Sequence, residues 1–223
     1  MGNSAESRRS RNAPTHLSAT PASRTSTKFE MDPRPGLVLA SESPRRRELL
    51  KLLCREFDVV SSGVPEVSKL NESPPKMVRR LAKAKAKAVQ VSRPHSVIIG
   101  ADTAVVCEGQ ILGKPDSEEE ARKMLLQLSG KTHKVLTGLC VLHEQRCCLG
   151  VSKTSVRFSR LSLQEIEEHL KTGEPFDKAG AYAIQGHASR YVDRIDGCYF
   201  NVVGLPISLL YRMLQKVGYP FHG

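Results

Sequence analysis

Residues 97–115 read VIIGADTAVVCEGQILGKP, and the rest of the chain is organised around them. The apolar pattern predicts a buried strand that is interrupted at Gly100-Ala101-Asp102-Thr103 and turns back at Glu108-Gly109. A carboxylate inside such a strand is costly to bury without a partner. The glycine before it indicates a β-bulge or the close approach of another backbone. Asp102 and Lys114, on the returning arm, form either a structural ion pair across the hairpin or two parts of one polar site.

Composition narrows the class of protein. The chain has 223 residues, of which 39% are hydrophobic, enough for one sizeable core. Its net charge of +11 points to an anionic partner such as a nucleotide, a nucleic acid or an acidic surface. Aromatic residues make up only 5%, which disfavours a stacking platform for single-stranded nucleic acid.

The cysteines and the hydropathy pattern predict a cytoplasmic protein. The six cysteines include no C-x-x-C pair and have no histidine at zinc-site spacing, which indicates reduced thiols. No apolar run approaches the roughly 18 residues of a membrane span, so we expect no membrane partner.

Residues 1–35 are rich in Ser, Thr, Arg and Pro, and we expect a disordered basic tail ahead of a folded domain at 36–223. Four arginines against one early acid also fit an organelle transit peptide, although the hydrophobic face is poor.

Strand-like and helix-like segments alternate through the first half of the chain and are followed by a hairpin. This order predicts an α/β fold with a mixed twisted sheet and flanking helices. We expect helices at 44–53, 75–91, 118–128, 162–171 and 206–217, with strands at 37–40, 57–60, 97–106, 135–142, 149–158 and 191–195.

The first helix has an unusual start. Ser43 is a suitable N-cap and Pro44 suits the first helical position. Arg45 and Arg46 then oppose the helix dipole, at about 0.3–1 kcal/mol each. A bound anion would reverse that effect, so we predict a phosphate site here; the alternative is a capped helix with solvated arginines.

The second helix carries many cations, of which one faces inward. A helical projection places Met77, Val78, Leu81, Ala84, Ala88 and Val89 on one apolar arc. Lys85 falls inside that arc and therefore needs an anionic partner, whereas the other cations form a solvated face. Glu66, in the loop before this helix, is either a ligand or a solvated acid.

Residues 176–186, FDKAGAYAIQG, have neither clean periodicity nor ordinary surface polarity. Their small residues allow backbone to approach a ligand closely. Gln185 carries a donor and an acceptor on one amide and can read a base edge, or it can satisfy loop backbone.

These residues together suggest phosphate chemistry. The cations suit a polyphosphate, and the carboxylates suit one or two Mg²⁺-like ions. Cationic clamps, a metal and an acid that activates water are what phosphate-ester cleavage needs. The candidates are Arg45, Arg46, Glu66, Lys85, Asp102, Lys114, Asp177, Lys178 and Gln185, and the sequence contains neither G-x-x-x-x-G-K-[ST] nor G-x-G-x-x-G.

Six motifs, in order along residues 37–217, resemble the Maf family of nucleoside triphosphate pyrophosphatases. They are ASESPRR from Ala40, GADT from Gly100, GKP from Gly113, LSG from Leu128, DKAGAYAIQG from Asp177 and NVVGLP from Asn201. The resemblance implies a two-lobed fold like that of inosine triphosphate pyrophosphatases, with the site in the cleft between the lobes. It also implies hydrolysis of a nucleoside triphosphate to the monophosphate and pyrophosphate with Mg, Mn or Co, and a homodimer.

The resemblance also implies roles for individual residues. Asp102 would be the general base or hold the metal, with Glu66 beside that metal, while water attacks the α-phosphorus. Ser41, Arg46, Lys85 and Lys114 match phosphate-handling positions. Arg45, Thr103 and Gln185 match the branch that prefers dTTP and UTP, which makes modified pyrimidine nucleotides further candidates. Glu42 stands where many relatives carry a smaller residue.

Two other functions stay open on the sequence alone. One is a purine-editing pyrophosphatase that prefers ITP or XTP. The other is a basic nucleic-acid-binding module without catalysis, although we expect no stable nucleic-acid complex.

Overall fold

The computed structural model describes residues 35–221, so the predicted tail at 1–35 lies almost wholly outside the described residues. In this part of the chain, seven strands form one mixed sheet in the order β2-β1-β3-β5-β6-β7, with β4 paired to β3. The strands are β1 (Leu37–Ala40), β2 (Asp58–Val59), β3 (Val97–Cys107), β4 (Gln110–Leu112), β5 (Thr132–His143), β6 (Arg146–Phe158) and β7 (Val192–Asp196). The predicted α/β fold with a mixed sheet is confirmed.

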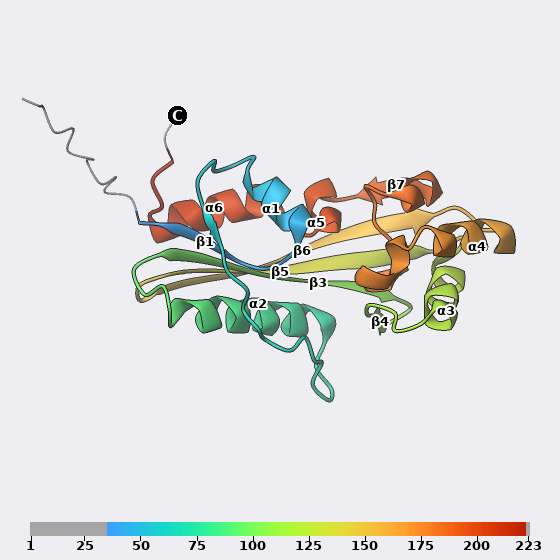
Figure 1. Ribbon diagram of the computed structural model, residues 1–223, viewed down its shortest axis with the longest axis horizontal. Helices are drawn as coiled ribbons and strands as arrows, with labels where there is room; N and C mark the ends of the chain where they lie inside the picture. The colour runs from blue at the N-terminus through green and yellow to red at the C-terminus, as the bar shows by residue number, and fades with distance from the viewer. Residues whose placement is uncertain (1–34, 222–223) are drawn as a thin grey trace, which may run out of the picture. The chain divides into compact units, whose positions relative to one another are not determined.

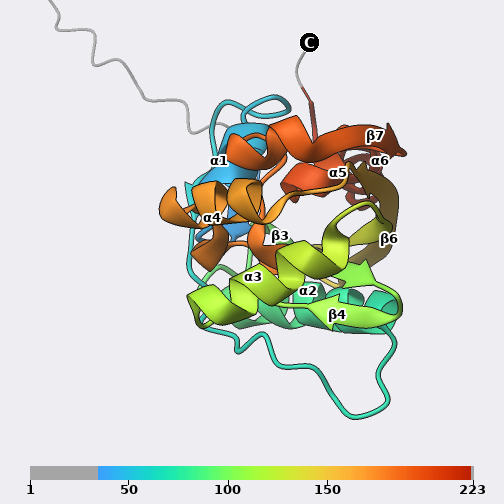
Figure 2. The ribbon, with the colours of Figure 1, turned by 90° about the vertical axis from the view of Figure 1, so that its right-hand side faces the viewer.

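Helices cover both faces of the sheet (Figure 1). α2 packs on one face, and α1, α5 and α6 pack on the other. α3 and α4 lie side by side at the far end of the long strands, joined by an ion pair between Arg122 and Glu167 (Figure 2). The helices are α1 (Pro44–Leu50), α2 (Pro74–Gln90), α3 (Glu118–Leu128), α4 (Leu163–Lys171), α5 (Tyr199–Val203) and α6 (Ile207–Val217), with 3₁₀ helices η1 (Glu174–Asp177), η2 (Ala179–Ala181) and η3 (His187–Tyr191).

The central strand β3 alternates between the two faces, as a strand with period two must. Val97, Ile99 and Ala101 join the core beneath α6, whereas Ile98 and Ala104 pack toward α2. Asp102 therefore points to the α2 side and Thr103 to the opposite side. The strand is continuous through both residues, so the interruption expected at Gly100–Thr103 is wrong.

Gly100 is explained by the close approach of α2. A Cβ on Gly100 would lie 2.1 Å from the Ala82 carbonyl oxygen, and one on Gly138 of β5 would lie 2.3 Å from that of Val78. The pairing of β3 with β5 runs without a register shift across Gly100, which excludes the β-bulge. Two glycines thus let the helix sit directly on the sheet.

The docking of α2 on these glycines sets which side of the helix is buried. The buried residues are Met77, Val78, Leu81, Ala82, Lys85, Ala86 and Val89. Ala88, which the projection assigned to the apolar arc, is exposed, and Ala84 is only half-buried. The buried arc is rotated toward Ala82 and Ala86 because these residues meet Gly100, and Lys85 remains at its centre.

The edge of β3 has a gap that positions the site. β1 pairs with β3 as far as Ala40 opposite Gly100. β4 pairs with the same edge of β3 only from Leu112 opposite Val105. Residues 101–104 therefore have no strand partner on that side.

Several element boundaries differ from the expected ones. α1 ends at Leu50 rather than at Leu53, since residues 51–53 form turns. The Ser43 side chain makes no capping hydrogen bond; its backbone N–H donates to Ser41 Oγ instead, at 3.3 Å. Among residues 35–221, no helix is long and apolar enough to cross a membrane.

Candidate functional site

A cavity of about 390 Å³ opens at the gap beside β3. Its wall contains residues from the end of β1, the start of α1, the loop before α2, the middle of β3, and the segment between η1 and η3. Every predicted site residue lines it: Ser41, Arg45, Arg46, Glu66, Lys85, Asp102, Thr103, Lys114, Asp177, Lys178 and Gln185. The fold thus brings together residues from positions 41 to 185.

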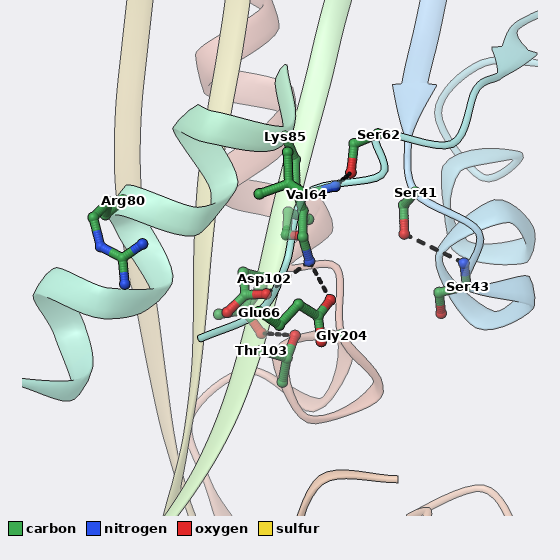
Figure 3. Close-up of polar contacts among 12 residues, drawn as sticks. Ser41, Ser43, Ser62, Val64, Glu66, Arg80, Lys85, Asp102, Thr103 and Gly204 are labelled. Carbon is green, nitrogen blue, oxygen red and sulfur yellow. Dashed lines mark hydrogen bonds and ion pairs between the residues drawn. The ribbon is translucent and has the colours of Figure 1, made fainter. Parts of the chain in front are cut away.

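Lys85 joins the two carboxylates of the cavity. It reaches from α2 to Asp102 on β3 and to Glu66 in the loop before the helix (Figure 3). The Lys85 Nζ–Asp102 Oδ1 distance is 2.8 Å, and both side chains are about 5% exposed. A third, weaker contact goes to the Ala101 carbonyl oxygen at 3.5 Å. All three ammonium donors are therefore directed at protein oxygens, and a phosphate would have to replace one of them.

The two carboxylates have opposite pKa shifts. Burial raises the pKa of Asp102, although Lys85 and Arg46 partly oppose that effect. Burial also raises the pKa of Glu66, but the hydrogen bond and charge of Lys85, with Lys114 and Arg46, outweigh it and leave the pKa lowered. The more buried acid is the one whose proton affinity is increased, which is a property expected of a general base.

Arg46 is buried, with 9% of its surface exposed, and among the described residues its hydrogen bonds go to three neutral oxygens. Its Nε donates to the Gly204 carbonyl at 2.9 Å, Nη1 to Ser41 Oγ at 3.1 Å and Nη2 to Thr103 Oγ1 at 3.0 Å. A guanidinium has five N–H groups, so one remains on each Nη atom. The interpretation of Arg46 as a solvated cation is wrong, because three contacts fix its orientation inside the protein.

Two threonine hydroxyl groups, hydrogen-bonded in series, orient Arg46. Thr137 Oγ1 lies 2.9 Å from Thr103 Oγ1 and donates its single proton to the Asn201 carbonyl at 3.1 Å. Thr103 must therefore donate to Thr137 and accept from Arg46. With its proton used in this way, Thr103 orients Arg46 and has no proton left for a ligand.

Lys114 and Arg45 carry the remaining cationic charge of the cavity. The Lys114 ammonium lies 3.9 Å from Glu66 Oε2, and its side chain is 59% exposed. The alternative of a structural Asp102–Lys114 pair is wrong, since Asp102 pairs with Lys85. Burial lowers the pKa of Arg45, and the carboxylates of Asp177 and Glu174 partly oppose that effect. Asp177 itself forms an ion pair with Lys178.

Gln185 occupies the tip of a tight turn. The Gly186 N–H donates to the Ala183 carbonyl at 3.1 Å, which makes Ile184 and Gln185 the two central residues. Ile184 is buried in the core, whereas Gln185 is exposed and lines the cavity. Within residues 35–221 the Gln185 amide has no hydrogen-bond partner, so its alternative role of satisfying loop backbone is not observed.

Glu174 is a residue that the sequence interpretation missed. Its carboxylate accepts hydrogen bonds from the backbone N–H groups of Ala183 and His187, on either side of that turn. In the sequence it follows Gly173 and precedes Pro175, where an acid at a helix start is an ordinary capping signal. The glycine at 186 was no clue by itself, because only the structure shows that the Glu174 carboxylate occupies the space of its missing side chain.

The carboxylates can be tested against a divalent metal. The described part of the chain contains no cluster of three or more His, Cys, Asp or Glu side chains able to hold a metal. Mg²⁺, however, is commonly bound by one or two carboxylates together with waters and substrate phosphates. Glu66 and Asp102, which share one ammonium group, fit that pattern.

The chain is similar to a known family and to several named relatives. The family model described as Maf-like protein matches residues 36–217. The dTTP/UTP pyrophosphatase of Geobacillus sp. (strain WCH70) is 50% identical over 183 residues, which cover 82% of this chain and 98% of that protein. The dTTP/UTP pyrophosphatase of Thermococcus onnurineus (strain NA1) is 48% identical over 183 residues, covering 82% and 98%.

Among solved structures, the Staphylococcus aureus Ham1 protein aligns with a TM-score of 0.48 and 14% identity. The alignment covers 82% of this chain and 99% of that chain. At this level the likeness carries no inference about function.

Proposed function

The chain belongs to the Maf-like protein family, and on that premise we propose that it hydrolyses nucleoside triphosphates to the monophosphate and pyrophosphate. The substrates we propose are dTTP, UTP and modified pyrimidine nucleotides, which the enzyme would remove from the nucleotide pool. The observation that carries the proposal is the cavity itself, where a buried acid with a raised pKa faces an oriented guanidinium and two ammonium groups. The relatives named dTTP/UTP pyrophosphatase support the substrate class.

The phosphate chain would lie against the cations. Arg46 offers one N–H on each Nη atom, a spacing that suits two oxygens of one phosphate. Lys114, at the rim, is free to move toward the departing pyrophosphate because its side chain is largely exposed. These groups would stabilise negative charge as it develops on the leaving group.

Asp102 would activate the attacking water. Lys85 donates to Oδ1, and no described residue donates to Oδ2, which leaves that oxygen free to accept a proton. The water oxygen would form a bond to the α-phosphorus as the bond from that phosphorus to the bridging oxygen breaks. The water proton would go to Asp102, and pyrophosphate would leave with the electron pair of the broken bond.

A divalent cation belongs to the same proposal. Glu66 and Asp102 would hold it, and when bound it would neutralise phosphate charge and lower the pKa of water. Its binding would compete with Lys85 for the two carboxylates, since both carboxylates now direct an oxygen at the Lys85 ammonium. We expect chelation to abolish turnover, and Mg²⁺, Mn²⁺ or Co²⁺ to restore it.

A nucleotide panel tests the function. Purified protein would be mixed with Mg²⁺ and each of UTP, dTTP, CTP, GTP, ITP and XTP, and pyrophosphate would be measured. We expect UTP and dTTP to have the highest kcat/KM. Preference for ITP or XTP would assign the purine-editing function instead, and salt-sensitive nucleic-acid binding without hydrolysis would assign a binding module.

We further propose a cytoplasmic homodimer. The support is the family resemblance and the cysteine spacing of the sequence, which indicates reduced thiols. Sedimentation of the purified protein would test the oligomeric state.

A further inference from the structure

The Glu174 carboxylate bonds to both ends of the turn that carries Gln185. The Glu174 Oε1 atom accepts from the Ala183 N–H at 3.1 Å, and Oε2 accepts from the His187 N–H at 2.6 Å. Ala183 opens the turn and His187 immediately follows it, so one carboxylate fixes both ends. Bonds from backbone N–H groups to a carboxylate are charge-assisted and stronger than neutral ones.

Gly186 is a glycine because of this carboxylate. A Cβ at position 186 would lie 1.9 Å from Glu174 Oε2 and 2.4 Å from its Cδ. The backbone at Gly186 has φ −107°, which any residue can adopt. Steric room for Glu174, and not backbone conformation, therefore accounts for the absence of a side chain here.

The rest of the segment is anchored independently of Glu174. The Gly180 N–H donates to the Gly113 carbonyl at 2.9 Å, which ties the segment to the arm that carries Lys114. Tyr182, before the turn, and Ala188, after it, are buried in the core. Loss of Glu174 would therefore loosen the turn between Ala183 and His187 without releasing the whole segment.

We propose that Glu174 is a positioning residue for base recognition, which sets the substrate selectivity by fixing the turn that presents Gln185 to the cavity. This inference rests on the proposed function, because it assigns Gln185 to the base of the bound nucleotide. A glutamine amide distinguishes bases only if its NH₂ donor and its oxygen acceptor are held opposite the matching groups on the edge of the base. The two hydrogen bonds from backbone N–H groups to Glu174 hold the turn, and with it Gln185, in that position.

The test compares Glu174→Gln with the wild-type protein. A glutamine at 174 keeps one oxygen acceptor but directs an NH₂ group at the other backbone N–H, so one of the two bonds is lost. UTP and CTP differ at the edge of the base. We expect the ratio of kcat/KM for UTP to that for CTP to fall by about tenfold, chiefly through the KM for UTP.

Two measurements separate a role in base recognition from a nonspecific disruption of the site. Inorganic tripolyphosphate has no base, and its inhibition constant should stay within about twofold of the wild-type value in Glu174→Gln. Gln185→Ala should lower the UTP/CTP ratio to the same extent, and the double variant should be no worse than Gln185→Ala alone. Glu168→Gln, on an exposed acid of α4, is the matched control and should change neither quantity.

Gly186→Ala disturbs the contact between position 186 and the Glu174 carboxylate without changing Glu174 itself. The added methyl group would displace the Glu174 carboxylate and should reproduce the selectivity loss. In a Glu174→Ala background the same substitution should have no further effect, since the obstructing oxygen is gone. Thermal unfolding of each variant verifies that it is folded.

A failure of the proposed function and a failure of the role of Glu174 give different results. A wild-type protein that hydrolyses neither UTP nor CTP overturns the proposed function. If the wild-type protein is active, three results overturn the role of Glu174 alone. These are an unchanged UTP/CTP ratio in Glu174→Gln, an equal loss of tripolyphosphate binding, or additive effects of the Glu174 and Gln185 substitutions.

Discussion

Lys85 is the residue that connects the packing of α2 to the chemistry of the cavity. A buried ammonium requires anionic partners, and here it has two, Glu66 and Asp102. It donates to both carboxylates and so orients them toward one point. The same arrangement prepares the acids for a ligand cation, which would take over part of the charge that Lys85 now neutralises.

Asp102→Asn removes the proposed base with little change of shape. We expect kcat for pyrophosphate release to fall by roughly 10²–10⁴-fold, the usual contribution of a positioned acid or base. The variant should remain folded, because Lys85 keeps its ion pair with Glu66. Glu119→Gln, on an exposed acid paired with Lys123, is the control. Turnover of Asp102→Asn within about threefold of wild type would remove Asp102 from this role.

The sequence identified the side chains of the site better than it identified the residues that they contact. The inward direction of Lys85 follows from helical periodicity, which depends on the local backbone alone. The contact of Arg46 with Gly204 joins residues 158 positions apart, and no local pattern encodes it. Glu174 was missed for a similar reason, because its role appears only when the chain folds back at residues 183–187.

Among the elements, α2 and β3 depend on each other most closely. Gly100 and Gly138 let the helix backbone approach the sheet, and this approach brings Lys85 to Asp102. The pattern of apolar residues predicted the helix almost to its ends, but it placed Ala88 on the buried side. That error arose because the projection cannot tell one alanine from another, whereas the fold buries Ala82 and Ala86 against Gly100.

Gly100→Ala tests this dependence. Its Cβ would lie 2.1 Å from the Ala82 carbonyl oxygen, so α2 must move away from the sheet. We expect a loss of about 1–3 kcal/mol in the free energy of unfolding, measured with urea, together with reduced turnover because Lys85 moves with the helix. The control is Gly36→Ala, where the added atom meets Ser96 Oγ at an ordinary 3.4 Å. Equal stability of the two variants would contradict the close-packing account.

At the scale of the whole molecule, the cavity exists because two strands share one edge of β3 without meeting. β1 ends with Ala40 opposite Gly100, β4 ends with Leu112 opposite Val105, and the site residues fill the interval. The sequence predicted the α/β class and most elements, since these follow from local periodicity and turn residues. It did not predict the gap, which depends on how far each neighbouring strand extends along β3.

A buried cluster of His133 on β5, Phe158 on β6 and Tyr182 connects the sheet to the segment that lines the cavity. His133 Nε2 lies 2.7 Å from the Tyr182 hydroxyl, while its Nδ1 has no partner among the described residues. Burial lowers the pKa of His133 from 6.5 to about 4. The folded protein therefore keeps this imidazole neutral at pH values where an unfolded chain protonates it.

The cluster makes stability depend on pH. Between pH 6.5 and about 4 the unfolded chain binds one more proton at His133 than the folded protein, so acidification lowers the free energy of unfolding. The full loss from this group is about 3 kcal/mol. His133→Gln cannot titrate, and its stability, measured with urea from pH 7 to pH 4, should fall less steeply than that of the wild-type protein. Parallel curves would contradict a buried neutral histidine.

The most direct test of the central claim is the fate of the water oxygen. Hydrolysis of UTP by the wild-type protein would be run in H₂¹⁸O with Mg²⁺, and the products would be analysed by mass spectrometry. Attack on the α-phosphorus by water activated beside Asp102 places one ¹⁸O in UMP and none in pyrophosphate. Label in pyrophosphate, or release of inorganic phosphate with UDP, would contradict the account.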